Sequence, residues 1–308
     1  MRLLVVTLAT IENELEACLE AIGRQTHTDY EHLVFRNLPN REAHEALYGT
    51  FMDRRDEFDL LVKVDADMVV RSARLFEDVD RRFTNDANLE VLTIGVWDFY
   101  TDRLVSGLNI YRNTLSWTRT GDLVFTDQFP DLVGRPVSDF TDLAPAASHC
   151  ADPHPFQAFH FGVHRGVKAR VALGRSMKSD YYTRYLDIHR TWNHYLRRRD
   201  RRLALAVLGG ELALGGRFSE TQLDYGNADV EAVYASYANC DTTALEGEIR
   251  RARRATWGLL PSGLRMEILR GDWLSLPLRW LVPLTLRDRV PGIARRLTQY
   301  WRPTGGDR

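Results

Sequence analysis

The chain has 308 residues, of which 44% are hydrophobic and 27% are charged, and its formal net charge is −1. These values indicate an ordinary globular protein with one large core or two small ones, and a neutral chain is not expected to bind nucleic acid. No uncharged stretch approaches the length of a bilayer-spanning helix, so we expect no transmembrane segment.

The cysteines and the first residues bear on the compartment. Cys18, Cys150 and Cys240 are too few and too scattered for a disulfide framework or a zinc knuckle, and they fit a reducing cytoplasm. The apolar residues 3–8 resemble a short signal-peptide core, but acidic residues follow from Glu12 onward, where a cleavage site would be needed. We therefore expect a first β-strand and a cytoplasmic location.

The first third of the chain alternates between strand and helix patterns. The hydrophobic periodicity predicts strands at about 2–8, 32–35 and 60–70 and helices at about 12–24, 41–52 and 72–84. Strands joined by helices usually lie parallel, so this alternation predicts a parallel sheet with right-handed crossovers.

The remainder of the chain is less regular. An apolar segment at about 89–96 leads into a hairpin-like pattern, and a region rich in Pro, Asp and His follows it at about 121–166. From about 177 to 214 the pattern is helical. We expect a division into an α/β domain, residues 1–175, and a helical region, residues 176–308.

Two carboxylates end the third predicted strand. Asp65 and Asp67 are one residue apart after an apolar run, so on an extended strand both point to the same face at its carboxyl end. Open α/β sheets bind ligands at that edge, and paired carboxylates repel each other unless a cation or several donors lie between them. The pattern indicates a metal or phosphate site, and an ordinary acidic strand-end turn is the alternative.

Three segments within about the first 165 residues resemble GT-A glycosyltransferases, most closely those of family 2. They are VVTLAT at residues 5–10, RQT at 24–26 after the first helix, and VDAD at 64–67, which is similar to the D-x-D motif of that family. The resemblance implies a Rossmann-like α/β fold, with a mixed and mostly parallel sheet flanked by helices and a helical C-terminal extension. It also implies metal-dependent sugar transfer from a nucleotide-sugar.

The resemblance assigns roles to residues near the motif. It implies that Asp67 binds Mn²⁺ or Mg²⁺, which bridges the donor diphosphate, and that Asp65 contacts the ribose or shares the metal. Lys63 is placed to reach a phosphate. The loop that holds the nucleotide base would contain Thr7, Ala9 and Glu12. The acidic residue that the family usually has after its second strand is absent here, and so is its later Glu-Asp motif.

The catalytic base and the third metal ligand each have alternatives. Asp127 follows an apolar run and is one candidate base, and Asp152 is the other. By similarity to the late metal-binding histidine of many GT-A enzymes, His149 would be the third ligand. His164, four residues after His160, competes for that role, although the interleaved Phe and Gly residues argue against a plain helix there.

The C-terminal segment is strongly basic. Residues 249–308 hold thirteen Arg, no Lys and four acidic residues, a balance of +9 that leaves −10 for the rest of the chain. Four tryptophans accompany the arginines. Such a composition suits an anionic membrane surface at the inner face of the membrane, and the alternative is a helical subdomain whose arginines pair with the acidic body.

The function that these patterns favour is transfer of a sugar to a hydroxyl of a glycan or lipid-linked acceptor, in cell-surface polysaccharide synthesis. A haloacid-dehalogenase-type phosphatase with Asp65 as nucleophile is a second interpretation, because the segment Asp65–Val69 also resembles the D-x-D motif of that family. A catalytically silent GT-A scaffold protein is a third.

Overall fold

A computed structural model describes residues 1–118, 121–126, 137–139, 143, 145–260 and 265. Met1–Ala255 form one compact unit and Thr256–Arg308 a second. The first unit is a mixed α/β structure in which helices flank a sheet, so the predicted fold class is confirmed. The predicted division after residue 175 falls between two helices and stays a prediction.

The strands alternate with helices in the first half of the chain, and helices dominate the second half. The strands are β1 Leu3–Ala9, β2 Tyr30–Arg36, β3 Leu60–Asp65, β4 Met68–Val70, β5 Val91–Asp98, β6 Arg103–Arg112, β7 Val137–Asp139 and β8 Ala147–His149. The helices are α1 Leu15–Gly23, α2 Asn40–Asp53, α3 Leu75–Asn85, α4 Pro155–Gly174, α5 Lys178–Arg198, α6 Arg201–Leu214, α7 Ala228–Ala235 and α8 Thr242–Trp257.

The sheet reverses its winding direction at β1. The strand order is β2-β1-β3-β6-β5-β8-β4, and β7 also pairs with β5. β2 and β3 both lie parallel to β1, on opposite sides of it, while β6 runs antiparallel to β3 and β5. The chain passes from β1 to β2 on one side and then crosses to β3 on the other side of β1. Open sheets bind ligands where neighbouring strands are connected in opposite directions in this way, at the carboxyl ends of β1 and β3.

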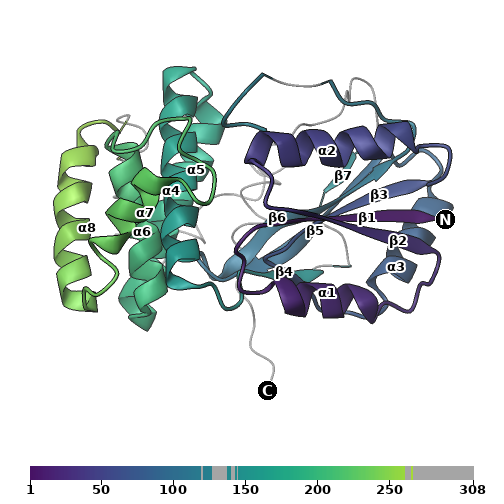
Figure 1. The fold of residues 1–308 in the computed structure, drawn as a ribbon, viewed down its shortest axis with the longest axis horizontal. Helices are drawn as coiled ribbons and strands as arrows, with labels where there is room; N and C mark the ends of the chain where they lie inside the picture. The colour runs from purple at the N-terminus through teal and green to yellow at the C-terminus, as the bar shows by residue number, and fades with distance from the viewer. Residues whose placement is uncertain (119–120, 127–136, 140–142, 144, 261–264, 266–308) are drawn as a thin grey trace, which may run out of the picture. The chain divides into compact units, whose positions relative to one another are not determined.

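Helices cover both faces of the sheet (Figure 1). On one face α1 and α3 pack on the sheet, and α3 contributes Phe76, Val79 and Phe83, which lie three or four residues apart and are buried. On the other face α2 buries Leu47 and Phe51 in a separate cluster. This spacing places the apolar side chains of each helix on one stripe, which explains why both helices lie flat on the sheet.

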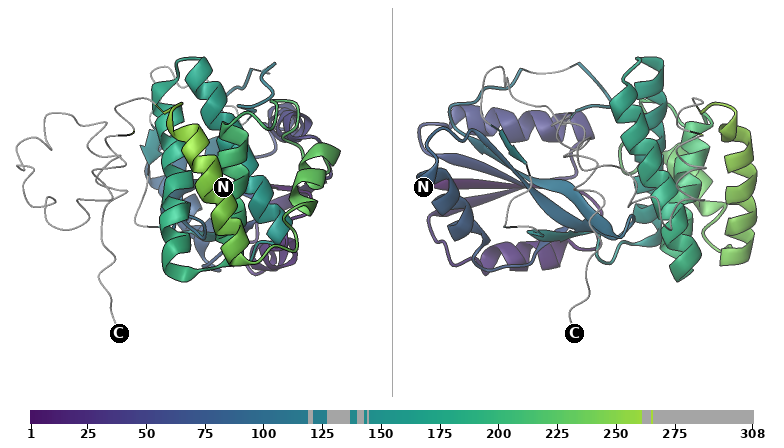
Figure 2. Two further views of the ribbon diagram at one scale, coloured as in Figure 1. Left: turned by 90° about the vertical axis from the view of Figure 1, so that its left-hand side faces the viewer. Right: turned by 180° about the vertical axis from the view of Figure 1, so that it is seen from behind.

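Beyond the carboxyl ends of β1–β3 lies a group of helices, α4–α8 (Figures 1 and 2). α4 and α6 cross closely because glycines face each other, and a Cβ atom on Gly162 would overlap the carbonyl oxygen of Ala206. Gly166 meets Gly210 in the same way. These glycines explain why the mixed Phe and Gly pattern is nevertheless helical, and the expectation against a plain helix there was wrong.

Other element boundaries also differ from the predictions. The strand expected at 60–70 is interrupted, since β3 ends at Asp65 and β4 begins at Met68. α4 begins at Pro155, inside the region expected to be irregular, where the His154 side chain caps its first turn. α5 and α6 are separate helices because Arg199 adopts a φ of 56° and Asp200 caps α6.

The membrane-related expectations are tested only in part. In the portion of the chain that the structure describes, no helix is both long enough and apolar enough to cross a membrane. Most of the basic segment, residues 266–308, lies outside the described residues.

The α4–α6 crossing gives a stability prediction. Gly162→Ala should lower the free energy of unfolding by about 3 kcal/mol or prevent folding, because the added methyl group has no space against the α6 backbone. Gly174→Ala, on the same helix with nothing near its Cβ position, is the matched control and should be neutral or stabilising. Chemical denaturation measures both, and equal stabilities would contradict the described packing.

Candidate metal centre

The site lies where β3 ends beside β1. Leu8 of β1 pairs with Asp65, and the Ala66 amide donates a hydrogen bond to the Leu8 carbonyl oxygen at 3.1 Å. The chain then turns into β4, in which Met68 pairs with His149 of the antiparallel strand β8. This pairing brings Asp67 next to a segment that follows it by about eighty residues.

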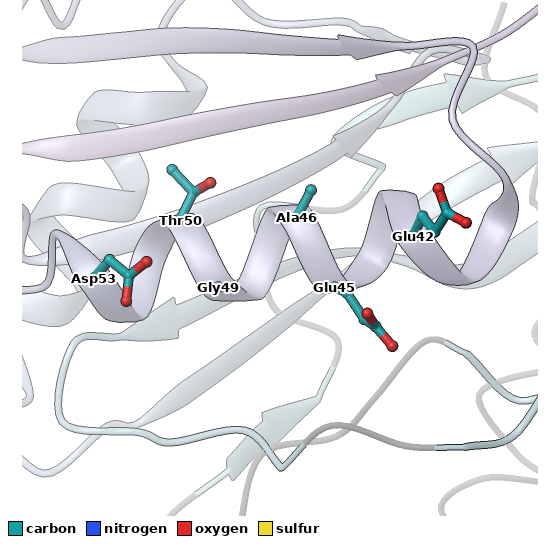
Figure 3. Close-up of a pocket in the computed structure, with 6 residues that line it drawn as sticks. All are labelled: Glu42, Glu45, Ala46, Gly49, Thr50 and Asp53. Carbon is teal, nitrogen blue, oxygen red and sulfur yellow. The ribbon is translucent and has the colours of Figure 1, made fainter.

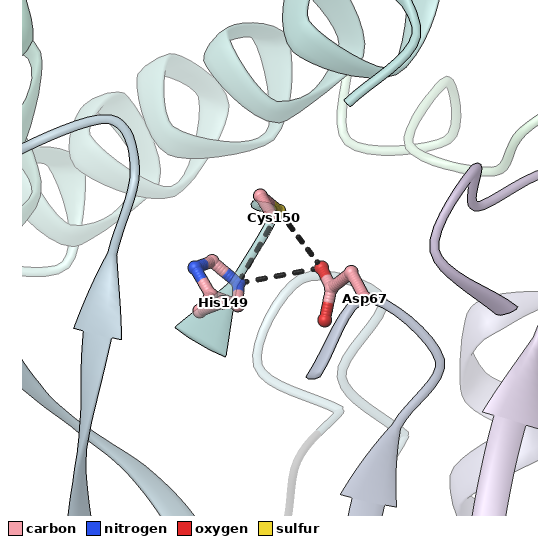
Figure 4. A group of neighbouring side chains, drawn as sticks. All are labelled: Asp67, His149 and Cys150. Atoms are coloured by element: carbon pink, nitrogen blue, oxygen red, sulfur yellow. Dashed lines mark hydrogen bonds and ion pairs between the residues drawn. The ribbon is translucent and has the colours of Figure 1, made fainter. Parts of the chain in front are cut away.

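Asp67, His149 and Cys150 form a cluster (Figure 4). His149 Nε2 lies 3.3 Å from Asp67 Oδ2, and Cys150 Sγ lies 3.2 Å from the same oxygen. The sulfur is 3.6 Å from His149 Nε2, so the three donor atoms make a nearly equilateral triangle. The Cys150 amide also donates to the Asp67 carbonyl oxygen at 2.8 Å, which fixes the two backbones together.

A buried carboxylate orients the histidine. His149 Nδ1 is 2.7 Å from Asp98 Oδ1, and Asp98 Oδ2 accepts hydrogen bonds from the Thr101 amide at 2.7 Å and hydroxyl at 2.6 Å. Asp98 is 3% exposed. A carboxylate on Nδ1 favours the tautomer with its proton there and leaves Nε2 available to a cation, an arrangement common around metal-bound histidines.

The charges in the cluster depend on one another. Burial opposes ionisation of Asp67 and Asp98, but His149 outweighs it and lowers the pKa of both carboxyl groups. Burial likewise disfavours the imidazolium, yet the acidic groups around it raise the pKa of His149 well above its ordinary value. Burial raises the pKa of the Cys150 thiol. Asp67 and Asp98 therefore stabilise a positive charge at the position of the His149 ring.

The donor set fits a divalent cation. Asp67 Oδ1 is buried and has no hydrogen-bond partner within the described part of the chain, although an ionised oxygen in that position normally has one. Ligand distances of about 2.0–2.3 Å at tetrahedral angles give donor separations of about 3.3–3.8 Å. The observed separations of 3.2, 3.3 and 3.6 Å are close to the lower part of that range. Oxygen, nitrogen and sulfur donors of these kinds are established ligands for such ions.

Other buried polar groups surround the cluster. Tyr225 is stacked on His160 with ring centroids 3.9 Å apart, and Tyr100 is stacked on Phe161 at 3.8 Å. Burial raises the pKa of both tyrosines, and the charge of Asp67 adds to the effect in each. Tyr100 follows β5, Phe161 lies on α4 and Tyr225 lies between α6 and α7. The ring centroids of Tyr100 and Phe161 are 6.5 and 6.1 Å from that of His149, so these helical-side residues border the cluster.

The residues expected to hold the nucleotide are engaged within the protein. Lys63 and Asp65 form an ion pair at 3.1 Å, so among the described residues Asp65 is not part of the metal-type cluster. The Thr7 hydroxyl is 2.9 Å from His32 Nε2 and its residue is fully buried. Ala9 is 3% exposed, and Glu12 accepts a hydrogen bond from the Thr10 hydroxyl at 2.8 Å.

The remaining predicted residues lie apart or outside the description. Asp152 has a side chain that is 77% exposed and pairs with Arg202 at 2.6 Å. Asp127 lies outside the described residues. His164 is on α4, one turn from His160, and in the described part of the chain it does not belong to the Asp67 cluster. Every assigned role, including those of Asp67 and His149, stays a prediction.

The sequence interpretation missed two contributors. Cys150 was set aside because cysteines are sparse, although its position beside His149 in a His-Cys pair was a usable signal. Asp98 ends an apolar strand, as Asp65 does, and that repetition was the signal for a second carboxylate.

A separate hollow on α2 carries no functional inference. It is shallow and is lined by Glu42, Glu45, Ala46, Gly49, Thr50 and Asp53 (Figure 3). Acidic residues on an exposed helix face are common without a ligand, and none of the cluster residues lines this hollow.

Comparisons with known proteins give little beyond the fold. No family model and no curated protein matches this chain. The mannosyltransferase PcManGT from Pyrobaculum calidifontis, solved in complex with GDP-Man and Mn²⁺, aligns over 83% of this chain and 87% of its own with 10% identity and a TM-score of 0.39. A197 from STIV aligns over 36% of this chain and 65% of its own, with 16% identity and a TM-score of 0.27. Similarities at this level carry no argument about activity.

The contact between Asp98 and His149 gives a binding prediction. Asp98→Asn should weaken divalent-metal affinity about 10- to 100-fold, because the imidazole loses the charged partner that orients it. Asp53→Asn, on the exposed face of α2, is the control and should leave the affinity unchanged. Calorimetric titration with Zn²⁺ or Mn²⁺ measures both, and equal affinities would remove Asp98 from the site.

Buried His160 gives a pH prediction. Burial lowers its pKa to about 4, so between about pH 6.5 and 4 the unfolded chain binds a proton that the folded chain does not. The free energy of unfolding should decrease as the pH is lowered from about 6.5 to about 4, and His160 accounts for at most about 3 kcal/mol of that decrease. His160→Gln should flatten the curve of unfolding free energy against pH, and an unchanged slope would contradict the burial.

Proposed function

We propose that this chain is a metal-dependent glycosyltransferase that moves a sugar from a nucleotide-sugar to a hydroxyl of a glycan or lipid-linked acceptor. The observation that supports it best is the half-buried Asp67–His149 pair at the carboxyl end of β3, with a buried Asp67 oxygen that lacks a partner in the described part of the chain. A cation there would lie at the switch point of the sheet, where nucleotides bind in related architectures.

In this proposal Asp67 and His149 hold the metal and leave further positions to the donor diphosphate. A bound divalent ion would supply charge neutralisation for the leaving diphosphate. Asp65, paired with Lys63 two residues earlier on β3, is left to contact the ribose rather than the metal. Asp98 keeps the His149 ring fixed, so the site is oriented before the donor arrives.

The structure constrains less closely the residues proposed to hold the nucleotide base and to accept the proton of the acceptor hydroxyl. Thr7 and Ala9 are buried, so their backbone would shape the pocket for the nucleotide base, and Glu12 would contribute a polar side chain from the loop after β1. Asp127 remains the proposed proton acceptor. Asp152 is the weaker choice, because its exposed carboxylate pairs with Arg202 and a general base must face the acceptor hydroxyl.

The finer assignments are also proposals. They are Mn²⁺ or Mg²⁺ as the metal, a role in cell-surface polysaccharide synthesis, a cytoplasmic location, and contact of residues 249–308 with an anionic membrane surface. The membrane contact is supported by the net charge of +9 on residues 249–308, against −10 on the rest of the chain.

Thermal stabilisation by donor and metal tests the proposal. A nucleoside diphosphate or its sugar conjugate should raise the Tm in the presence of Mn²⁺ and much less without it, because ligands that bind only the folded state stabilise it by mass action. Asp67→Asn should abolish the metal-dependent part of the shift, and Asp53→Asn should retain it.

Two results would refute the proposal. One is a nucleotide-induced shift of equal size with and without metal in the wild-type protein, and the other is an unchanged shift in Asp67→Asn. Formation of a stable beryllium fluoride adduct at Asp65 would instead favour the phosphatase interpretation.

A further inference from the structure

We propose that Cys150 is the third protein ligand of this centre, which therefore prefers a borderline-soft divalent ion such as Zn²⁺ or Co²⁺ to Mg²⁺. This inference rests on the metal site of the proposed function and specifies its chemistry. It replaces the expectation of a purely oxygen- and nitrogen-lined site.

The position of the sulfur supports a ligand role. Cys150 is 1% exposed, and its Sγ faces both Asp67 Oδ2 at 3.2 Å and His149 Nε2 at 3.6 Å. A buried cysteine usually packs among apolar side chains, whereas this thiol points at a carboxylate and an imidazole. Two neighbouring backbone contacts, the Cys150 amide to Asp67 and the pairing of Met68 with His149, hold it there.

A second observation points to a cation at the same place. Asp67 Oδ1 is buried without a partner among the described residues, while Asp67 Oδ2 already accepts the thiol and the imidazole. The triangle of donor atoms is made with Oδ2, and its edges of 3.2, 3.3 and 3.6 Å are close to the separations of about 3.3–3.8 Å that a tetrahedral ion with these ligands requires. An ion bound to this carboxylate would compensate the charge that its unpartnered oxygen shares.

The chemistry of the donors sets the choice of ion. Mg²⁺ prefers octahedral oxygen ligands and retains water, whereas a set of carboxylate, imidazole and thiolate suits Zn²⁺ and Co²⁺. On binding, the protons on the Cys150 thiol and on His149 Nε2 pass to the buffer, and a sulfur–metal and a nitrogen–metal bond form with no change in oxidation state. Metal binding at this site should therefore be accompanied by proton release, and the release should be smaller in Cys150→Ser.

Cys18 provides a matched control within the same chain. It is also a fully buried thiol, but it contacts the Asp65 carbonyl oxygen at 3.8 Å and has no place in the cluster. Cys18→Ser should therefore leave metal binding unchanged, while Cys150→Ser should reduce Zn²⁺ affinity by at least about a hundredfold, more than loss of an outer partner costs.

X-ray absorption on the full-length wild-type protein loaded with Zn²⁺ is the deciding experiment. We expect one sulfur scatterer at about 2.3 Å together with nitrogen and oxygen scatterers. In the Co²⁺-loaded protein, a sulfur-to-cobalt charge-transfer band should appear, survive Cys18→Ser and a thousandfold excess of Mg²⁺, and disappear in Cys150→Ser.

The outcomes separate this inference from the proposed function. Metal binding that depends on Asp67 and His149 but shows only nitrogen and oxygen scatterers would overturn the role of Cys150 and leave the metal-dependent transferase standing. Absence of any metal binding by the wild-type protein would overturn both. If Cys150→Ser does not fold, the wild-type absorption spectrum alone decides.

Discussion

The short antiparallel pairing of β4 with β8 is the constraint on which the site depends. It sets Met68 opposite His149, while β5 on the other side of β8 sets Asp98 opposite the same histidine. His149 is thus held between two carboxylates, one at the end of β5 and one in the turn that precedes β4. β8 is the strand that pairs with both β4 and β5, and these two pairings bring Asp67 and Asp98 within reach of one imidazole.

The electrostatics follow from that arrangement. Two carboxylates around one site, Asp98 buried and Asp67 half-buried, need a compensating positive charge, and in the protein alone the imidazole supplies it. A divalent ion would supply it better, because it can bind the Asp67 carboxylate and the Cys150 sulfur directly. The fold therefore concentrates negative charge at the switch point of the sheet, and under the proposed function a diphosphate would bind there only together with a cation.

The regular first third of the fold could be predicted from the sequence, and much of the rest could not. Strands and helices up to α3 follow simple hydrophobic periods, so their order and the parallel arrangement of β1, β2 and β3 could be predicted, whereas the antiparallel β4 and β6 make the whole sheet mixed. α4 was missed because Gly162 and Gly166, which usually disfavour helices, are required here by the close crossing with α6. Asp67 and His149 were predicted as metal ligands from motif similarity, and the structure brings them together while their roles stay predictions. Asp98 and Cys150 depend on strand pairings between distant segments, which local patterns do not contain.

The position of a bound metal tests the central claim most directly. In crystals of the wild-type protein grown with Mn²⁺ and a nucleoside diphosphate, we expect an anomalous peak about 2.0–2.3 Å from an Asp67 oxygen and from His149 Nε2, with the diphosphate beside it at the ends of β1 and β3. A metal peak elsewhere, or a diphosphate bound at that place without metal, would contradict the account.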